Sequence, residues 1–257
     1  RVPEAALRAS ELGGPAAPQL SLSAAGFDLI AEMKLRSPSA GDLAAQTLDP
    51  VQRLEAYAEG GAAIVSVLTE PSRFGGELAH LRLASDVLSP YRVPVMRKDF
   101  LVDPYQVLEA RANGASGVLL IVRMLSREGL IEMLDCAAEH RLFVLLEAFD
   151  EKDLELATDL ALDRQGRDEQ VLMGLNCRNL DSLQIDFRRF AALRDKLPAQ
   201  WPGVAESGVQ EAADVQAVAA LGYRLALVGT RLMRDAEPAT AVARLIAAGR
   251  GEVTESS

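Results

Sequence analysis

The 257-residue chain has few cysteines and no long apolar runs, and each shortage excludes a class of protein. Its two cysteines, Cys136 and Cys177, are expected in a helix and at a strand end, so the sequence predicts no disulfide framework. No apolar run reaches the length of a membrane span, and residues 1–20 lack the apolar core of a signal peptide. We therefore expect a cytoplasmic protein without a membrane anchor.

Positive charge is also scarce. The net charge is −10 and the pI is about 4.8, so the long-range field repels nucleic acid and anionic membranes. The sequence therefore predicts a small-molecule partner and no nucleic-acid or membrane partner. If that molecule is anionic, its pocket has to be locally basic. We also expect a monomer.

Histidine is also scarce, with two residues in the chain. His80 and His140 both fall in helical segments, where packing or surface roles are expected rather than catalysis. Cys177 follows a strand, but no histidine stands at a strand end to activate it, so we interpret it as a packed thiol. No metal site is predicted.

What the chain does contain is a repeated alternation of apolar strands and amphipathic helices. With 49% hydrophobic residues, it can bury a large core. The strands are too apolar to have one wet face, which favours a single closed parallel (β/α)8 TIM barrel over an open doubly wound sheet. The eight expected strands are 27–34, 62–68, 93–100, 117–122, 142–148, 171–176, 203–208 and 225–230.

The same pattern predicts the domain boundaries. Residues 1–27 are expected to form a short N-terminal extension with a small helix and a lead-in, residues 28–250 the catalytic barrel, and residues 251–257 a disordered tail. A polar insertion at 161–170 precedes the sixth strand, on the face away from the strand C-termini, and we interpret it as structurally neutral.

Polar side chains gather where the strands end. In a barrel of this kind the carboxyl ends of the strands form the active site, so these side chains should meet at one mouth. Lysines and carboxylates focused on one cavity would shift each other's proton affinity and supply acids and bases. The candidates are Glu32, Lys34, Lys98, Glu147, Asn176, Glu206 and Ser207. An ammonium beside a second cation is expected to have a lowered pKa.

A phosphate site is predicted at the last two strands. Gly208 and Gly229 follow these strands, where exposed backbone N–H groups and a helix N-terminus can bind an anion. Thr230 lies in the second of these loops. Ser37 could add a hydroxyl, and Arg178 a second cation.

Taken together, six motifs carry a family resemblance: IAEMKLRSPSAG, RKDFLVDPYQ, LLEAF, GLNCRNL, VAESGV and LVGTRLM. In this order and spacing they closely resemble the indole-3-glycerol phosphate synthase family of tryptophan biosynthesis. The likeness runs from about Asp28 to the last helix. It implies a (β/α)8 barrel that converts 1-(2-carboxyphenylamino)-1-deoxyribulose 5-phosphate into indole-3-glycerol phosphate, carbon dioxide and water without a cofactor.

The resemblance also implies residue roles. Lys98 would be the general acid, and Lys34 would hold the substrate carboxylate or act as acid in dehydration. Glu32 and Glu147 would orient the lysines or take the ring proton, and which one is the base stays open. Three further groups follow: Asn176, Glu206 and Ser207 for the hydroxyls and carboxylate; Ser37, Arg178, Gly208, Gly229 and Thr230 for phosphate; and Phe100, Leu119 and Leu180 for the aromatic ring.

Two other functions are compatible with such a barrel. The first is a phosphosugar isomerase such as phosphoribosylanthranilate isomerase, but the Cys and Asp pair that its reaction looks to need is replaced here by Glu32, Lys34 and Asn176. The second is a phosphosugar-binding barrel without activity. The presence of both Lys98 and Glu147 counts against it.

Overall fold

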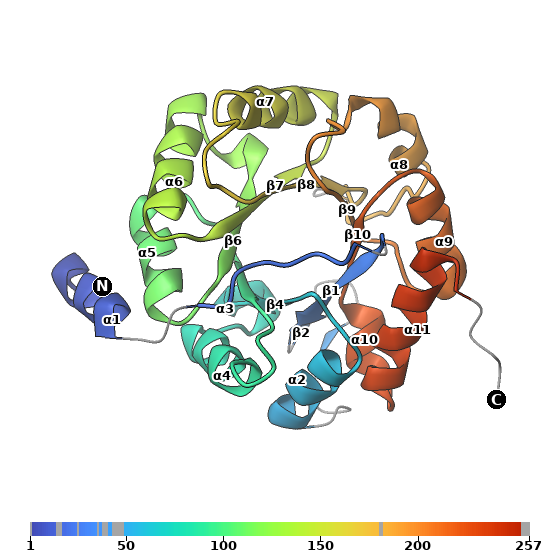
Figure 1. The fold of residues 1–257 in the computed structure, drawn as a ribbon, viewed down its shortest axis with the longest axis horizontal. Helices are drawn as coiled ribbons and strands as arrows, with labels where there is room; N and C mark the ends of the chain where they lie inside the picture. The colour runs from blue at the N-terminus through green and yellow to red at the C-terminus, as the bar shows by residue number, and fades with distance from the viewer. Residues whose placement is uncertain are drawn as a thin grey trace.

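The structure is a closed barrel of eight parallel strands (Figure 1), seen in a computed structural model that describes residues 2–13, 17–24, 26–34, 36–37, 41–42, 49–179 and 182–252. The strands are β1 (Asp28–Met33), β4 (Ile64–Leu68), β5 (Val95–Lys98), β6 (Gly117–Ile121), β7 (Phe143–Ala148), β8 (Val171–Asn176), β9 (Gly203–Glu206) and β10 (Leu225–Val228). β1 pairs in parallel with both β4 and β10, which closes the sheet. The predicted (β/α)8 barrel is confirmed, and the open sheet is excluded.

Helices surround the barrel (Figure 1). They are α1 (Glu4–Gly13), α2 (Pro50–Glu59), α3 (Pro71–Phe74), α4 (Leu78–Leu88), α5 (Pro104–Ala112), α6 (Arg127–Glu139), α7 (Glu151–Leu162), α8 (Arg189–Ala192), α9 (Ala212–Ala220), α10 (Thr230–Arg234) and α11 (Pro238–Arg250), with 3-10 turns at Val122–Met124 and Arg194–Lys196. Asp49 and Asp103 accept N-terminal backbone N–H groups, each before a proline in the first turn. Local sequence therefore sets these helix starts.

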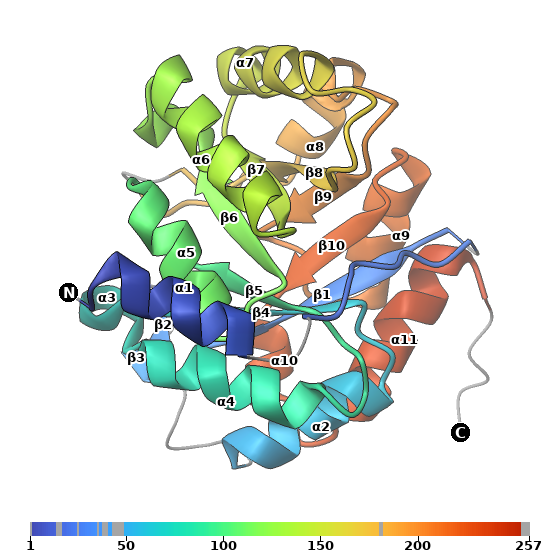
Figure 2. The same ribbon diagram turned by 60° about the vertical axis from the view of Figure 1, so that its left-hand side comes forward.

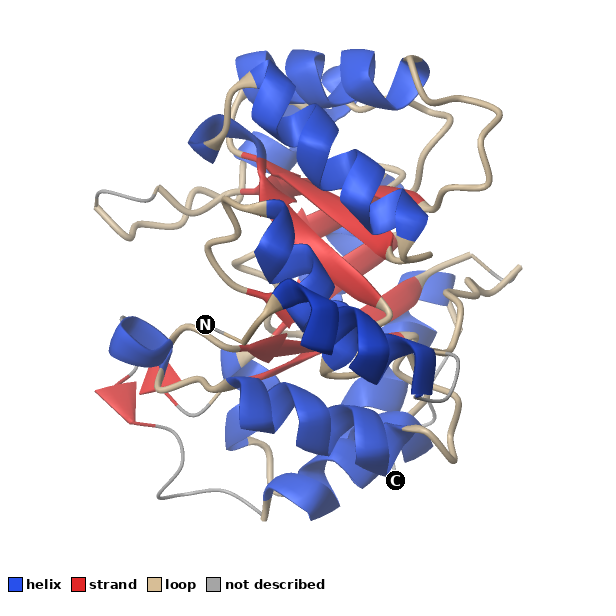
Figure 3. Ribbon diagram, turned by 90° about the vertical axis from the view of Figure 1, so that its left-hand side faces the viewer, coloured by secondary structure: helices blue, strands red, loops and turns tan. Residues whose placement is uncertain are grey.

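Two apolar layers hold the barrel together. One fills its interior, with Ile30, Ile64 and Leu145 from different strands, and the other lies between the strands and the helices. Strands are buried on both faces, which explains why their sequences show no polar alternation. Figure 3 shows the strands inside a shell of helices.

The lead-in to β1 crosses the amino-terminal end of the barrel (Figures 1 and 2). Leu20 belongs to the interior cluster, and its carbonyl accepts a hydrogen bond of 2.8 Å from the Gln170 side chain, just before β8. This segment therefore covers the barrel end opposite the strand C-termini. Within the described residues, no helix is both long and apolar enough to cross a lipid bilayer.

The polar insertion lies at the same amino-terminal end, between α7 and β8. Arg164, only 6% exposed, pairs with Glu169 at 2.6 Å and with Asp135 at 2.8 Å. The insertion thus has its own ion pairs, far along the strands from the carboxyl ends. One feature not foreseen is a short antiparallel pair, β2 (Arg36–Ser37) with β3 (Gly41–Asp42), after β1. Residues 253–257 of the proposed tail lie outside the described residues.

A glycine on β6 tests the interior packing. A Cβ added at Gly117 would lie 2.4 Å from the Phe143 ring on β7, whereas at Gly129 on α6 it would meet only ordinary contacts at 3.5 Å. Gly117→Ala should therefore lower the free energy of unfolding by about 1–3 kcal/mol through overpacking. Gly129→Ala, the matched control, should raise it by roughly 0.5 kcal/mol. Urea denaturation measures both; equal effects of the two substitutions would contradict the packing described.

Candidate active site

A pocket of about 930 Å³ opens at the carboxyl ends of the strands. All seven polar side chains singled out at strand ends line it: Glu32, Lys34, Lys98, Glu147, Asn176, Glu206 and Ser207. They come from five strands that are far apart in the chain, and only closure of the barrel brings them together.

Lys98 lies between two carboxylates. Its Nζ is 3.3 Å from Glu147 Oε1 and 3.4 Å from Glu206 Oε2. Asn176 donates to the same Glu147 oxygen at 2.8 Å, and its own Oδ1 accepts the Arg178 backbone N–H at 2.9 Å. These contacts fix the Glu147 carboxylate from two sides.

The expected lowering of the Lys98 pKa is wrong. Burial, the largest influence, disfavours the charged ammonium, but the attraction of Glu147, Glu206 and Glu32 outweighs it and raises the pKa well above its ordinary value. The second cation, Lys34, is paired with Glu32 and does not offset three carboxylates. Lys98 is therefore held as an ammonium in the free protein.

The pKa of Glu206 is also raised, but for a carboxyl group this favours the neutral form. Glu206 is 1% exposed, and burial followed by repulsion from Glu147 raises its pKa well above the ordinary value, although Lys98 opposes this. With one ammonium beside two buried carboxylates, Glu206 is driven towards its protonated form. Gly174 on β8 makes room for it, because a Cβ there would lie 2.2 Å from Glu206 Oε1.

Glu32 and Lys34 form a second ion pair on β1. The pair lies at one face because strand side chains alternate. Burial favours protonation of Glu32, yet Lys34 and then Lys98 lower its pKa below the ordinary value. A Cβ at Gly229 would lie 2.1 Å from Glu32 Oε1 and 2.9 Å from Lys34 Nζ, so only glycine leaves space for this pair.

The predicted phosphate residues gather on one side of the pocket. Gly208, Gly229, Thr230 and Arg178 line it. Ser207 and Gly208 both have left-handed backbone, with φ of 65° and 83°. The Ser37 side chain lies outside the described residues. Sequence reasoning missed Arg231 and Arg234. Both lie on α10, which begins directly after Gly229, and both line the pocket. The available signal was their position just after a glycine loop of the kind predicted to bind phosphate.

An apolar wall lies on another side. Phe100 and Leu119 line the pocket as expected, together with Ile121 and Phe149 on the same side and Leu227 on β10, close to Gly229, which were not foreseen. These three belong to otherwise ordinary apolar segments, so nothing in the sequence distinguished them. The Arg73 guanidinium lies 5.9 Å from the centre of the Phe100 ring. Leu180 lies outside the described residues.

Cys177 is a packed thiol, as its sequence context indicated. Its Sγ donates to the Ser207 carbonyl at 3.1 Å, and burial, the largest influence, raises its pKa to about 11. The described residues contain no group of His, Cys, Asp or Glu side chains that could hold a metal ion.

A closed parallel barrel with its polar pocket at the strand C-termini has the architecture of a TIM-barrel enzyme. Solved structures share the fold: 3-hexulose-6-phosphate synthase from Salmonella typhimurium, 13% identical, has a TM-score of 0.63 over 88% of this chain and 100% of that one. Thiamine phosphate pyrophosphorylase from Pyrococcus furiosus, 12% identical, has a TM-score of 0.60 over 88% and 96%. At these identities the likeness concerns the fold alone.

Sequence comparison identifies the family. The model of indole-3-glycerol phosphate synthase matches residues 16–245. Proteins of that name are 43% identical in Nocardioides sp., over 92% of this chain and 86% of the relative, and 40% identical in Mycobacterium avium and Mycobacterium tuberculosis, over 96% and 89%. The chain belongs to the indole-3-glycerol phosphate synthase family.

The raised pKa of Glu206 predicts how stability depends on pH. The folded protein keeps a proton that the unfolded chain releases above its ordinary pKa of about 4.3. The free energy of unfolding should therefore fall as pH rises from about 5 towards the raised pKa, by at most ~1.4 kcal/mol per pH unit. Glu206→Gln stays neutral and should remove this decline.

Urea denaturation between about pH 5 and 8 measures both slopes. Glu128→Gln, at an exposed glutamate on α6, should leave the wild-type slope unchanged. Parallel profiles for wild type and Glu206→Gln would contradict the assignment of the proton to Glu206.

Proposed function

We propose that the chain closes the indole ring of 1-(2-carboxyphenylamino)-1-deoxyribulose 5-phosphate, with loss of carbon dioxide and water. Family membership supports the reaction, and one observation carries its assignment to this pocket: Lys98 lies between Glu147 and Glu206 in a pocket that apolar side chains and the Gly208 and Gly229 loops also line. The proposed reaction uses side chains alone.

Lys98 is proposed as the general acid of ring closure. As the aromatic carbon attacks the ribulose carbonyl, the carbonyl oxygen becomes an alkoxide that is more basic than an amine, and Lys98 can protonate it. The raised pKa ensures that this proton is present when substrate arrives. The carboxylates make Lys98 a weaker acid, but they hold its proton in place until the more basic alkoxide forms.

Glu147 is proposed as the general base, which takes the proton lost from the newly formed ring. The alternative, Glu32, is paired with Lys34 and has a lowered pKa, which weakens it as a base. Lys34 would then bind the substrate carboxylate before decarboxylation, and Glu32 would orient it. Asn176, Glu206 and Ser207 would contact the ribulose hydroxyls and the carboxylate, and the neutral carboxyl of Glu206 can donate a hydrogen bond.

Substrate binding is proposed to use both sides of the pocket. Gly208, Gly229 and Thr230, with Arg178 and Ser37, would bind the phosphate through backbone N–H groups and a cation. Phe100, Leu119 and Leu180 would contact the anthranilate ring. Binding energy from the phosphate, remote from the reacting carbons, can hold the compact conformer that ring closure needs.

The remaining sequence-based interpretations stay proposals. They are a catalytic barrel over residues 28–250 after an extension at 1–27, a monomeric state and a cytoplasmic location. The two free cysteines support a reducing compartment. An isomerase is disfavoured because β1 and β8 present Glu32, Lys34 and Asn176 to the pocket.

The assay follows indole absorbance and fluorescence after addition of the carboxyphenylamino-deoxyribulose phosphate. The wild type should form indole-3-glycerol phosphate, and Lys98→Ala should lower kcat/KM by at least about 100-fold, because general acid catalysis contributes about 10²–10⁴-fold. Lys152→Ala, at an exposed lysine on α7, is the matched control and should retain full activity.

Circular dichroism shows whether Lys98→Ala keeps its fold. Undiminished turnover by the folded variant would refute Lys98 as the acid. No product with the wild type would refute the proposed function itself.

A further inference from the structure

Arg97 adjoins Lys98 on β5 but points to the opposite face of the sheet, away from the pocket. It is a guanidinium with only 5% of its side chain exposed, between the barrel and α5. A buried charge of this kind is costly unless every donor is satisfied. Because Arg97 does not line the pocket, a role there does not explain why the chain keeps this buried charge.

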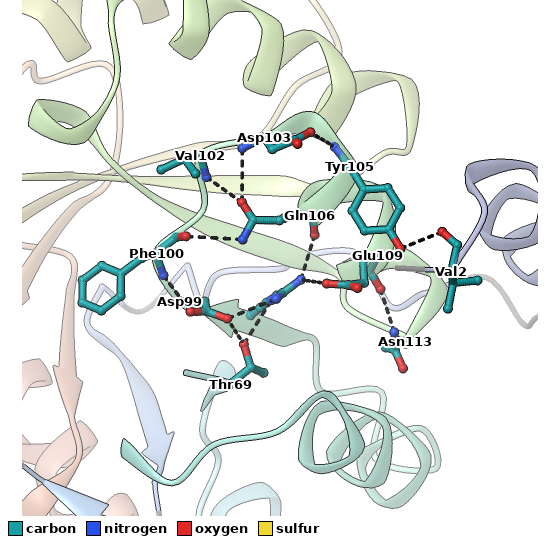
Figure 4. A network of polar contacts seen from close by, with 11 residues as sticks. Val2, Thr69, Asp99, Phe100, Val102, Asp103, Tyr105, Gln106, Glu109 and Asn113 are labelled. Carbon is teal, nitrogen blue, oxygen red and sulfur yellow. Dashed lines mark hydrogen bonds and ion pairs between the residues drawn. The ribbon is translucent and has the colours of Figure 1, made fainter. Parts of the chain in front are cut away.

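All three nitrogen atoms of the Arg97 guanidinium are engaged (Figure 4). Nε donates to Thr69 Oγ1 at 3.0 Å, and Nη2 donates to Asp99 Oδ2 at 3.1 Å. Nη1 donates to the Gln106 carbonyl and to Glu109 Oε2, both at 2.9 Å. One side chain thus ties the ends of β4 and β5 to helix α5.

Asp99 and Thr69 hold the backbone that directly follows Lys98. Asp99 Oδ2 accepts the Thr69 hydroxyl, while its Oδ1 accepts the Phe100 backbone N–H at 2.8 Å. The Thr69 backbone N–H in turn donates to the Lys98 carbonyl at 3.1 Å. The two peptide units that follow Lys98, Lys98–Asp99 and Asp99–Phe100, are therefore fixed to the same small network.

Gln106 extends the network along the loop that carries Phe100 (Figure 4). Its Oε1 accepts the backbone N–H groups of Val102 and Asp103 at 2.7 and 3.2 Å, and its Nε2 donates to the Phe100 carbonyl at 3.4 Å. The side-chain amide of Gln106 thus binds three backbone groups of the loop between β5 and α5. These contacts lie outside the pocket, and they hold Phe100 in the apolar wall.

We propose that Thr69, Arg97 and Asp99 form a positioning network that sets the Lys98 ammonium for proton transfer, and that Thr69 and Arg97 do so without lining the pocket. This inference rests on the proposed function. A reacting group misplaced by about 1 Å can lose on the order of 10²-fold in rate. Supporting contacts that hold such a group within about 0.5 Å are therefore part of its chemistry.

Thr69→Val tests the network with the smallest change. Valine has nearly the shape of threonine but removes the hydroxyl that joins Arg97 to Asp99. We expect kcat to fall about tenfold while KM stays within about threefold, because the pocket lining is intact. Thr69→Ser restores the hydroxyl and should return kcat to within about twofold of wild type.

Thr158→Val is the matched control. The Thr158 hydroxyl on α7 has no hydrogen-bond partner within the described residues, so its removal should leave kcat and KM unchanged. The Lys98→Ala background gives a second readout under single-turnover conditions with enzyme in excess. If Thr69 acts through Lys98, Thr69→Val should slow Lys98→Ala no further.

Four outcomes overturn the inference. A Thr69→Val kcat equal to wild type refutes the network and leaves the proposed function standing. A loss that multiplies undiminished with Lys98→Ala, or that Thr69→Ser fails to restore, shows a role in general structure only. Absence of turnover in the wild type refutes the proposed function, and the inference with it.

Discussion

The structure depends on closure of a parallel sheet. Because β1 bonds to β4 on one side and β10 on the other, eight strands end at one rim, and residues as far apart in the chain as Glu32 and Gly229 become neighbours. A strand delivers residues i and i+2 to the same face, so Glu32 and Lys34 reach the pocket together, while Arg97 and Lys98 are divided between the helix layer and the pocket. Lys98, which lines the pocket, and Arg97, which is proposed to position it, thus come from the same strand, β5.

Electrostatics at the rim follow from how few cations serve several buried carboxylates. Glu32, Glu147 and Glu206 are all nearly inaccessible, and Lys34 and Lys98 lie among them. The outcome is a division of states: Lys98 stays protonated, Glu32 stays ionised and Glu206 is driven towards its neutral form. An acidic protein thereby keeps an ammonium at the rim, beside the loops proposed to bind phosphate.

Much of this was readable from the sequence. The eight strands appear as apolar runs because both faces are buried, and Glu32, Lys98, Glu147 and Glu206 stand out as charges ending such runs. The direction of the Lys98 pKa was not readable, because its partners come from β7 and β9 and their distances depend on barrel closure. For the same reason Thr69 drew no attention: its role exists only where the ends of β4 and β5 meet. The β2–β3 pair was missed because two-residue strands carry no periodicity.

The most direct measurement is a crystal structure of the chain with indole-3-glycerol phosphate bound. The account predicts the phosphate at the Gly208 and Gly229 loops, the indole ring against Phe100 and Leu119, and Lys98 Nζ within about 3 Å of a glycerol oxygen or of the ring carbon that bore the carbonyl. A product molecule bound elsewhere, or one seated in the pocket with Lys98 turned away from it, would contradict the account.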